Sequence, residues 1–207
     1  MLKKYPIDIN QSESKKIKEI KKTGKLIVIS GPSGAGKTTL IRKVIQKIPT
    51  LTFSVSATTR PIREGEIESI DYFFVSSEEF SDLIRNDAFI EWAKVHGNLY
   101  GTLKNQIKEL IEKGKNIVLD IDEQGANQIK KKEIPALFIY ILPPSLKELK
   151  KRLKERDTEH IKEIDRRLQS AKEQITSKGF YDYVIINDDI RKVVKKLKKI
   201  IENYIEK

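Results

Sequence analysis

The sequence predicts an α/β fold in which a parallel sheet is covered by helices on both faces. Two observations lead to this prediction: a phosphate-binding loop stands between an apolar strand and a helix, and apolar strand segments then alternate with amphipathic helix segments. Strands that alternate with helices form a parallel sheet, because each crossover returns the chain to the same end of the sheet. Ligands of such sheets bind at the carboxyl ends of the strands, where the loop should therefore lie.

The phosphate-binding loop covers residues 31–38, GPSGAGKT, which match the pattern GxxxxGK[ST] at every defined position. Residues 25–30 before it predict a buried strand, and residues 39–45 continue it as a helix. The glycines let backbone N–H groups converge on an anion, and the helix N-terminus adds free N–H groups and its dipole. The motif predicts a nucleoside triphosphate site in which Lys37 reaches the β- and γ-phosphates and Thr38 binds Mg²⁺.

A small inserted segment follows this first unit. Residues 53–57 and 71–75 have the alternating and aromatic character of short strands, and residues 58–66 between them are polar and rich in turn formers. Residues 76–84 open with the capping box SSEE and predict a helix with one apolar face. Residues 54–102 are therefore expected to form an α+β insertion between core elements.

The core is expected to resume at residue 103. Its predicted elements are a helix at 103–113 that ends before Gly114, strands at 116–122, 136–142 and 183–187, a helix after the second capping box at 145–148, a long helix capped by Thr158, and a final helix capped by Asp188 or Asp189. The strand at 116–122 ends in two carboxylates, Asp120 and Asp122. Residues 1–24 are expected to be an extension whose role the sequence does not reveal.

The composition favours a soluble, cytoplasmic protein. The chain has 207 residues, of which 38% are hydrophobic and 34% charged, so one substantial core is expected rather than disorder. No apolar run approaches the ~20 residues of a membrane span. The absence of cysteine excludes disulfides and thiolate metal sites. The net charge of +11 comes from lysines interleaved with glutamates, without the aromatic residues that stack bases, so nucleic acid is not expected as the main partner.

A second phosphate site is indicated in the inserted segment. Arg60 and Arg63 are three residues apart on the polar turn, directly before the extended stretch that carries Tyr72. A guanidinium grips a phosphate through two parallel N–H groups, so the two arginines and the phenol could clamp a second phosphate. Taken alone, the same pattern also fits two solvated loop arginines.

Several motifs in order resemble those of guanylate kinases, over roughly residues 25–205. They lie at 54–66 (SVSATTRPIREGE), 71–75 (DYFFV), 89–93 (FIEWA), 97–102 (GNLYGT), 119–125 (LDIDEQG), 141–145 (ILPPS) and 186–189 (INDD). The resemblance implies a P-loop kinase fold and a transferase that moves the γ-phosphoryl group of ATP to GMP, giving ADP and GDP. The place of such an enzyme is purine nucleotide metabolism, including the recycling of GMP and dGMP.

The resemblance also implies an organisation and a set of site residues. The P-loop core comprises residues 25–53, 103–144 and 179–207, the GMP-binding segment residues 54–102, and a helical lid residues 145–178. The expected GMP-binding residues are Ser56, Arg60, Arg63, Tyr72, Glu91, Tyr100, Thr102 and Asp122. The expected ATP-binding residues are Gly31, Pro32, Ser33, Gly34, Ala35, Gly36, Lys37, Thr38, Thr39 and Asn187. The expected catalytic residues are Lys37, Arg60, Arg152, Arg156 and Arg167, and Thr38 and Asp120 are expected to hold the cofactor Mg²⁺, directly or through water.

Some positions depart from the family pattern, and some questions stay open. Ser69 stands where a glycine is usual, and the lid turn around Arg156 lacks the usual flanking glycines. Arg166 competes with Arg167 for the ATP side. The alternatives to a guanylate kinase are a related kinase for a ribose bisphosphate and a non-catalytic binding module. The intact phosphate loop and the guanine-reading set, Glu91, Thr102 and Asp122, argue against both. Oligomeric state, donor preference and dGMP tolerance stay open.

Overall fold

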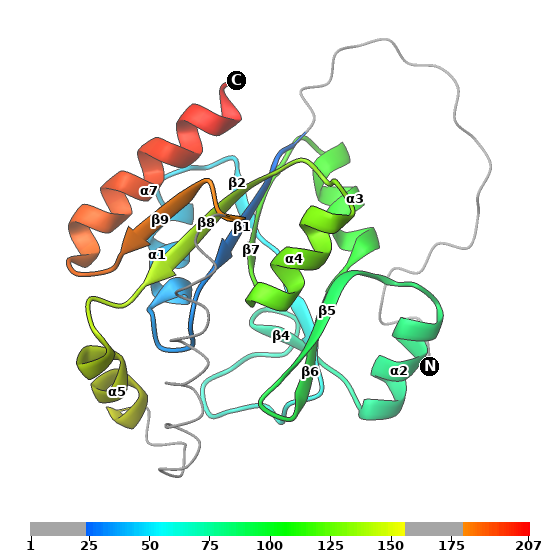
Figure 1. Ribbon diagram of the computed structural model, residues 1–207. Helices are drawn as coiled ribbons and strands as arrows, with labels where there is room; N and C mark the ends of the chain where they lie inside the picture. Colours follow the sequence, from blue (N-terminus) through cyan, green and yellow to red (C-terminus); the bar gives the residue numbers. More distant parts are fainter. Residues whose placement is uncertain (1–23, 156–179) are drawn as a thin grey trace.

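A five-stranded parallel sheet forms the centre of the computed structural model, which describes residues 24–155 and 180–207 (Figure 1). The strand order is β2-β7-β1-β8-β9. The strands are β1 (Leu26–Ser30), β2 (Leu51–Phe53), β7 (Asn116–Asp120), β8 (Ala136–Leu142) and β9 (Tyr183–Ile186). All four pairings are parallel, so the carboxyl ends of the strands meet at one edge, and the phosphate loop leaves β1 at that edge.

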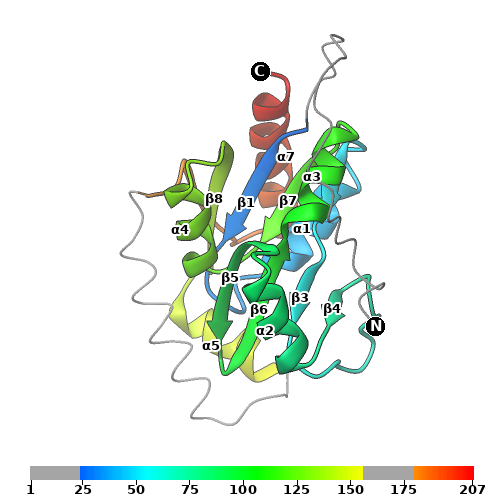
Figure 2. The ribbon, with the colours of Figure 1, turned by 90° about the vertical axis from the view of Figure 1, so that its right-hand side faces the viewer.

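Helices cover both faces of this sheet, as the alternation of side chains along β1 requires (Figure 2). Ile27 and Ile29 face one core cluster, which contains the apolar residues of α1 (Lys37–Ile45) and α7 (Ile190–Ile205). Leu26 and Val28 face the other cluster, which contains those of α3 (Lys104–Glu112) and α4 (Glu123–Lys131). The predicted fold, a parallel sheet flanked by helices, is confirmed.

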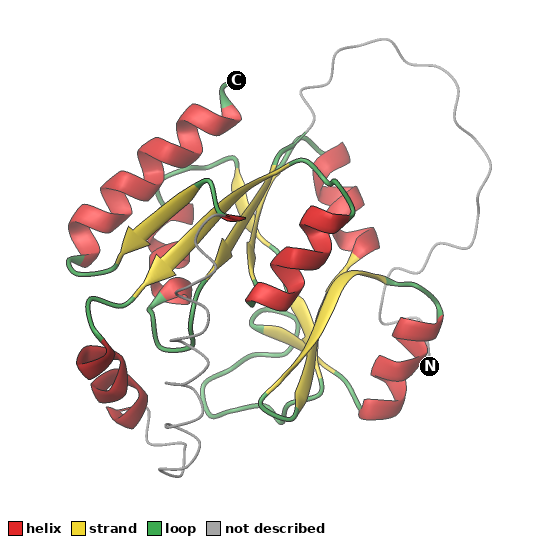
Figure 3. Cartoon of the chain, in the orientation of Figure 1, coloured by secondary structure: helices red, strands yellow, loops and turns green. Residues whose placement is uncertain are grey.

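A second sheet lies beyond the carboxyl ends of the first (Figure 3). Its order is β4-β3-β6-β5, from β3 (Ser56–Thr58), β4 (Tyr72–Phe74), β5 (Phe89–Val95) and β6 (Asn98–Leu103). β3 and β4 run parallel, whereas β6 is antiparallel to both β3 and β5. Helix α2 (Ser77–Arg85) closes a separate small core in which the rings of Phe80 and Phe89 stack at 4.6 Å.

Helix α4 joins the two sheets. Its Gln128 side chain donates to the backbone carbonyl of Trp92 in β5 and accepts from the Trp92 N–H, at 2.6 and 3.2 Å. Lys132, just after the helix, donates from Nζ to the Ile90 carbonyl at 2.6 Å. These bonds fix β5 against the main sheet, so the inserted segment is anchored through this helix.

Local signals placed several element ends correctly. Ser76 and Glu79 form the expected reciprocal capping box of α2. Asp189, rather than Asp188, caps α7 by accepting from two backbone N–H groups. Gly114 ends α3 with a φ of 71°. At the start of α5 (Leu146–Glu155), Ser145 Oγ accepts from the Glu148 N–H at 3.1 Å.

Other expectations need correction. The strand expected at 53–57 is two strands in different sheets, because the chain crosses between them at Ser54, whose N–H still donates to the Val118 carbonyl. Helix α4 carried no clear pattern in the sequence, since it buries only Gly125, Ala126 and Ile129 among polar neighbours. The helix expected after Thr158 lies outside the described residues, as does the extension through residue 23.

The described elements include no membrane span. Within residues 24–155 and 180–207, no helix is both long and apolar enough to cross a bilayer.

Candidate functional site

The phosphate loop has the backbone conformation that its glycines permit. Gly36, at the start of α1, adopts a left-handed conformation with φ 87°. A Cβ atom at this position would also lie 2.5 Å from Nδ2 of Asn187, so a side chain is excluded both by conformation and by space. The turn brings the first N–H groups of α1 toward the carboxyl ends of the strands, where an anion can bind them.

Lys37, Thr38 and Asp120 meet at the mouth of this loop. Lys37 Nζ donates to the carbonyl oxygens of Gly31 and Pro32 at 2.8 and 3.4 Å and lies 3.7 Å from Asp120 Oδ1. Thr38 Oγ1 donates to Asp120 Oδ2 at 2.7 Å. Asp120 is the last residue of β7, which pairs directly with β1, and Lys37 is the first residue of α1, which follows β1 through the phosphate loop.

Oxygen ligands at this position suit Mg²⁺. A threonine hydroxyl and one carboxylate, together with substrate phosphates and water, form the usual protein environment of that ion. Within the described ranges no cluster of three His, Cys, Asp or Glu side chains could hold a metal by itself. The residues present therefore fit a metal that arrives with a phosphate ligand.

Asn187 supports the phosphate loop through a hydrogen bond to its backbone. Its buried side chain donates from Nδ2 to the Ala35 carbonyl at 2.8 Å, and its own N–H donates to the Leu142 carbonyl at 2.7 Å. Arg152, in α5, lies near the same point of the loop: its Nη1 is 3.9 Å from the position that a Gly36 Cβ would occupy. Arg152 is held there by Glu148, at 2.9 Å from its Nε. Arg156 and Arg167 lie outside the described residues.

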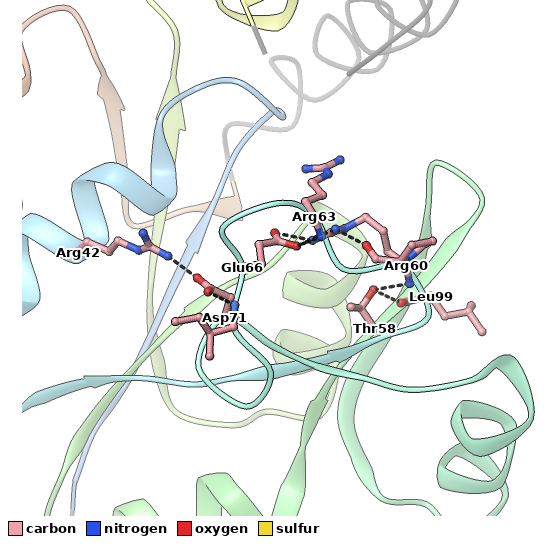
Figure 4. Close-up of polar contacts among 9 residues, drawn as sticks. Arg42, Thr58, Arg60, Arg63, Glu66, Asp71 and Leu99 are labelled. Atoms are coloured by element: carbon pink, nitrogen blue, oxygen red, sulfur yellow. Dashed lines mark hydrogen bonds and ion pairs between the residues drawn. The ribbon is translucent and has the colours of Figure 1, made fainter. Parts of the chain in front are cut away.

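Arg60 is nearly buried, with 8% of its surface exposed, and Glu66 holds its guanidinium (Figure 4). Nη1 donates to Glu66 Oε2 at 3.0 Å and Nη2 donates to Glu66 Oε1 at 2.8 Å. The guanidinium carbon lies 5.3 Å from the ring centre of Tyr72. Burial alone lowers the pKa of Arg60, but the bonds to Glu66 and the nearby Tyr100 hydroxyl raise it overall. The group is therefore a permanent cation.

Tyr72 and Tyr100 complete the surroundings of that cation. Their ring centres lie 6.0 Å apart, edge to face. Burial, and then the negative charge of Asp120, raises the pKa of Tyr72 to about 12, so its hydroxyl stays a neutral donor.

A buried carboxylate, Glu91, lies on the same sheet with only 3% of its surface exposed. It accepts from Thr102 Oγ1 at 2.5 Å across the β5–β6 pair. Burial, followed by the charge of Asp122, raises the pKa of Glu91 to about 7. Burial also raises the pKa of Asp122, although that carboxylate caps α4 by accepting from the Gly125 N–H at 2.9 Å.

The remaining expected residues lie at the edge of this group. Ser56 stands opposite Tyr72 in the β3–β4 register and is half-buried. The side chain of Arg63 extends away from Glu66, whereas its backbone N–H donates to Glu66 Oε2 at 2.8 Å (Figure 4). The structure thus brings the described members of the expected set to facing sides of the two sheets.

Three features of the site did not come from the sequence. Glu66 lies within the motif at residues 54–66, and its spacing from Arg60 and Arg63 on a turn is the signal that points to it. Gly125 packs against Glu91, and Arg42 of α1 forms an ion pair at 2.5 Å with Asp71 of the second-sheet loop (Figure 4). Neither of these two long-range contacts has a local sequence signal.

Known proteins resemble this chain over most of its length. The family model described as guanylate kinase matches residues 23–204. A guanylate kinase of Caldanaerobacter subterraneus subsp. tengcongensis is 50% identical over 182 residues, covering 88% of each chain. One of Thermotoga maritima is 43% identical over 180 residues, covering 87% of each. The crystal structure of guanylate kinase from Anaplasma phagocytophilum aligns with a TM-score of 0.74 at 35% identity, covering 89% of this chain and 88% of that one.

Proposed function

The chain belongs to the guanylate kinase family, and we propose that it transfers the γ-phosphoryl group of ATP to GMP, giving ADP and GDP. One observation supports this assignment above the others. Strand β7 ends at Asp120, which contacts Lys37 and Thr38. Two residues later, Asp122 caps α4 by accepting from the N–H of Gly125, the residue that lies against Glu91. A single strand end therefore serves a donor site on one side and an acceptor site on the other.

On the donor side, we assign the ATP phosphates to the N–H groups of residues 31–39 and to Lys37. In the structure Lys37 Nζ is held by loop carbonyls, and a bound phosphate would take over these contacts. Mg²⁺ bound with ATP at Thr38 and Asp120 would neutralise phosphate charge during transfer. Asn187 supports the loop backbone through Ala35, and Arg152 supplies a cation beside Gly36.

On the acceptor side, Glu91 explains the choice of base. Guanine presents N1–H and N2–H₂ donors on one edge, and an ionised carboxylate accepts both, whereas adenine has no such pair of donors. Thr102 and Asp122 adjoin Glu91, and Ser56 lies on β3, which pairs with β6, the strand of Thr102. Removal of such a buried partner costs about 1–3 kcal/mol, which is enough to discriminate between bases.

The acceptor phosphate is assigned to Arg60, Arg63, Tyr72 and Tyr100. The cation of Arg60 and the neutral phenol of Tyr72 bind a phosphate without competing for its protons. Phosphoryl transfer depends mainly on positioning and charge stabilisation. We assign residues 25–53, 103–144 and 179–207 to the donor core, 54–102 to the acceptor segment and 145–178 to a lid. Arg156 and Arg167 keep their expected catalytic role in this proposal.

A coupled assay of ADP formation against GMP, AMP, CMP, UMP and a ribose bisphosphate tests the proposal. We expect turnover that requires both GMP and Mg²⁺–ATP, with much weaker turnover of the other acceptors. Stronger turnover with the ribose bisphosphate would favour the related kinase instead. Failure to bind Mg²⁺–ATP in a calorimetric titration would favour a non-catalytic module.

A further inference from the structure

We propose that Glu66 is a positioning residue that orients Arg60 and Arg63 for the phosphate of the acceptor nucleotide; this inference rests on the function proposed above. Arg60 is almost entirely buried, and a buried guanidinium needs a partner for nearly every N–H group. Glu66 is the carboxylate that meets this need, through two parallel bonds of 2.8 and 3.0 Å.

Apart from an interaction with the Tyr100 hydroxyl, the hydrogen bonds of Arg60 leave one edge of the guanidinium for a ligand. Nη1 donates one N–H to Glu66 and the other to the Pro61 carbonyl, the latter at 2.6 Å. Nη2 donates one N–H to Glu66. The Nε–H and the second N–H of Nη2 share the remaining edge of the planar group, the arrangement that binds two oxygens of a phosphate. Glu66 thus occupies the outer edge and turns the other edge to the ligand.

The same carboxylate connects the two arginines. Glu66 Oε2 accepts from Arg60 Nη1 and from the backbone N–H of Arg63. The turn is closed further by the Glu66 N–H, which donates to the Arg63 carbonyl at 3.1 Å. The hydrogen bonds to Arg60, then the bond to Arg63, outweigh burial and lower the pKa of Glu66, so it remains ionised at neutral pH. One carboxylate therefore holds both the Arg60 guanidinium and the backbone from which the Arg63 side chain extends.

A second carboxylate on the same loop provides a matched control. Asp71 accepts from the Ile67 N–H at 2.9 Å and pairs with Arg42, and neither of these partners belongs to the arginine pair. Loss of Asp71 should loosen the loop without releasing Arg60. Glu66 and Asp71 therefore separate an effect on orientation from a general effect on loop stability.

The test compares Glu66→Gln, Glu66→Asp and Asp71→Asn with the unaltered chain. Kd for GMP and for guanosine is measured by calorimetry, and KM for GMP and for ATP by the coupled assay. We expect Glu66→Gln to weaken GMP binding by about tenfold or more, with unchanged guanosine binding and unchanged KM for ATP. Glu66→Asp keeps the negative charge on a shorter side chain. Its Kd for GMP should lie between those of the unaltered chain and Glu66→Gln.

Three results would overturn the role proposed for Glu66, and a fourth would overturn the proposed function instead. Equal losses for GMP and guanosine, or the same loss in Asp71→Asn, would overturn the proposal in favour of a structural role. Unchanged or tighter GMP binding in Glu66→Gln would also overturn it, the latter because Glu66 would then compete with the phosphate. Failure of the unaltered chain to bind and phosphorylate GMP would instead overturn the proposed function.

Discussion

Gly125 lies directly against the carboxylate of Glu91: a Cβ atom at position 125 would come within 2.2 Å of Glu91 Oε2. Gly125 lies in α4, which packs against the main sheet, and Glu91 lies in β5 of the second sheet. The carboxylate of Glu91, to which we assign guanine recognition, is therefore positioned by residues of both parts of the fold. Its other oxygen is held by Thr102, so it has little room to retreat.

Gly125→Ala should displace Glu91 and impair the acceptor site. The added methyl group forces the carboxylate away from Thr102, because Glu91 is enclosed on the remaining sides. We expect KM for GMP to rise by about tenfold, in line with one lost buried hydrogen bond, while KM for ATP stays the same. Lys131→Ala, at an exposed position of the same helix, is the control. Equal effects of both changes on KM for GMP would contradict this explanation.

GMP binding should weaken as the pH falls through about 7, because protonation of Glu91 removes an acceptor for the guanine N–H groups. Below that pH the association constant should fall about tenfold for each pH unit. Calorimetry from roughly pH 5.5 to 8.5, a range that spans the pKa of Glu91, measures this dependence. Glu91→Gln should bind weakly and keep only the titration of the GMP phosphate itself. A pH profile identical in both proteins would show that Glu91 is not the titrating group.

The same carboxylate should reduce stability at high pH. Its folded pKa lies above its ordinary value, so the folded state holds the proton more tightly, and its contribution to stability declines between about 4.5 and 7 as the pH rises. The full effect is up to about 3 kcal/mol, since each pKa unit corresponds to about 1.4 kcal/mol. Urea denaturation at pH 8 should therefore give a larger unfolding free energy for Glu91→Gln than for the unaltered chain. At pH 5 this difference should be smaller.

Lys37→Met should abolish most turnover without unfolding the protein. The ammonium group is the cation nearest Asp120 at the phosphate loop, and its loss removes charge stabilisation during transfer. We expect kcat to fall about a hundred- to a thousandfold, the usual loss for one stabilising group. Lys43→Met, at an exposed position of the same helix, should be nearly neutral. Comparable kcat values for the two variants would contradict the assigned role.

Asn187→Ala should weaken ATP binding through the loop backbone. The change leaves the buried Ala35 carbonyl without its partner, at a cost of about 1–3 kcal/mol in unfolding free energy. KM for ATP should rise more than KM for GMP, since Asn187 braces only the donor loop. The adjacent exposed residue offers the control Asp188→Ala. A selective rise in KM for GMP would be inconsistent with this arrangement.

Ser69 shows why a glycine is usual at its position in the family. Its φ is 66°, a left-handed conformation that costs most residues about 1–2 kcal/mol. Ser69→Gly should change the unfolding free energy by less than about 1 kcal/mol, because relief of strain is offset by greater freedom of the unfolded chain. Ser69→Val, with a branched Cβ, should lose more than about 1 kcal/mol. Denaturation in urea measures both, and equal stability of the two variants would contradict the strain.

The sequence by itself determined the features that depend on neighbours along the chain. The loop at residues 31–38, the capping boxes and the apolar run at residues 25–30 are local patterns, and each predicted its structure because short-range sterics, hydrogen bonds and burial decide it. The resemblance of ordered motifs then predicted the family. Helix α4 gives no clear signal in the sequence, because two of its three buried residues, Gly125 and Ala126, are small and Ile129 alone makes no apolar stripe.

The tertiary structure decided how distant polar groups are paired. Whether Arg60 is a solvated loop residue or a buried cation depends on Glu66 and the rings around it, which only the folded loop brings together. Likewise Glu91 acquires its raised pKa from burial and from Asp122, which comes from the end of another sheet. Solvation and charge interactions depend on the distance between groups in space, and separation along the chain does not give that distance.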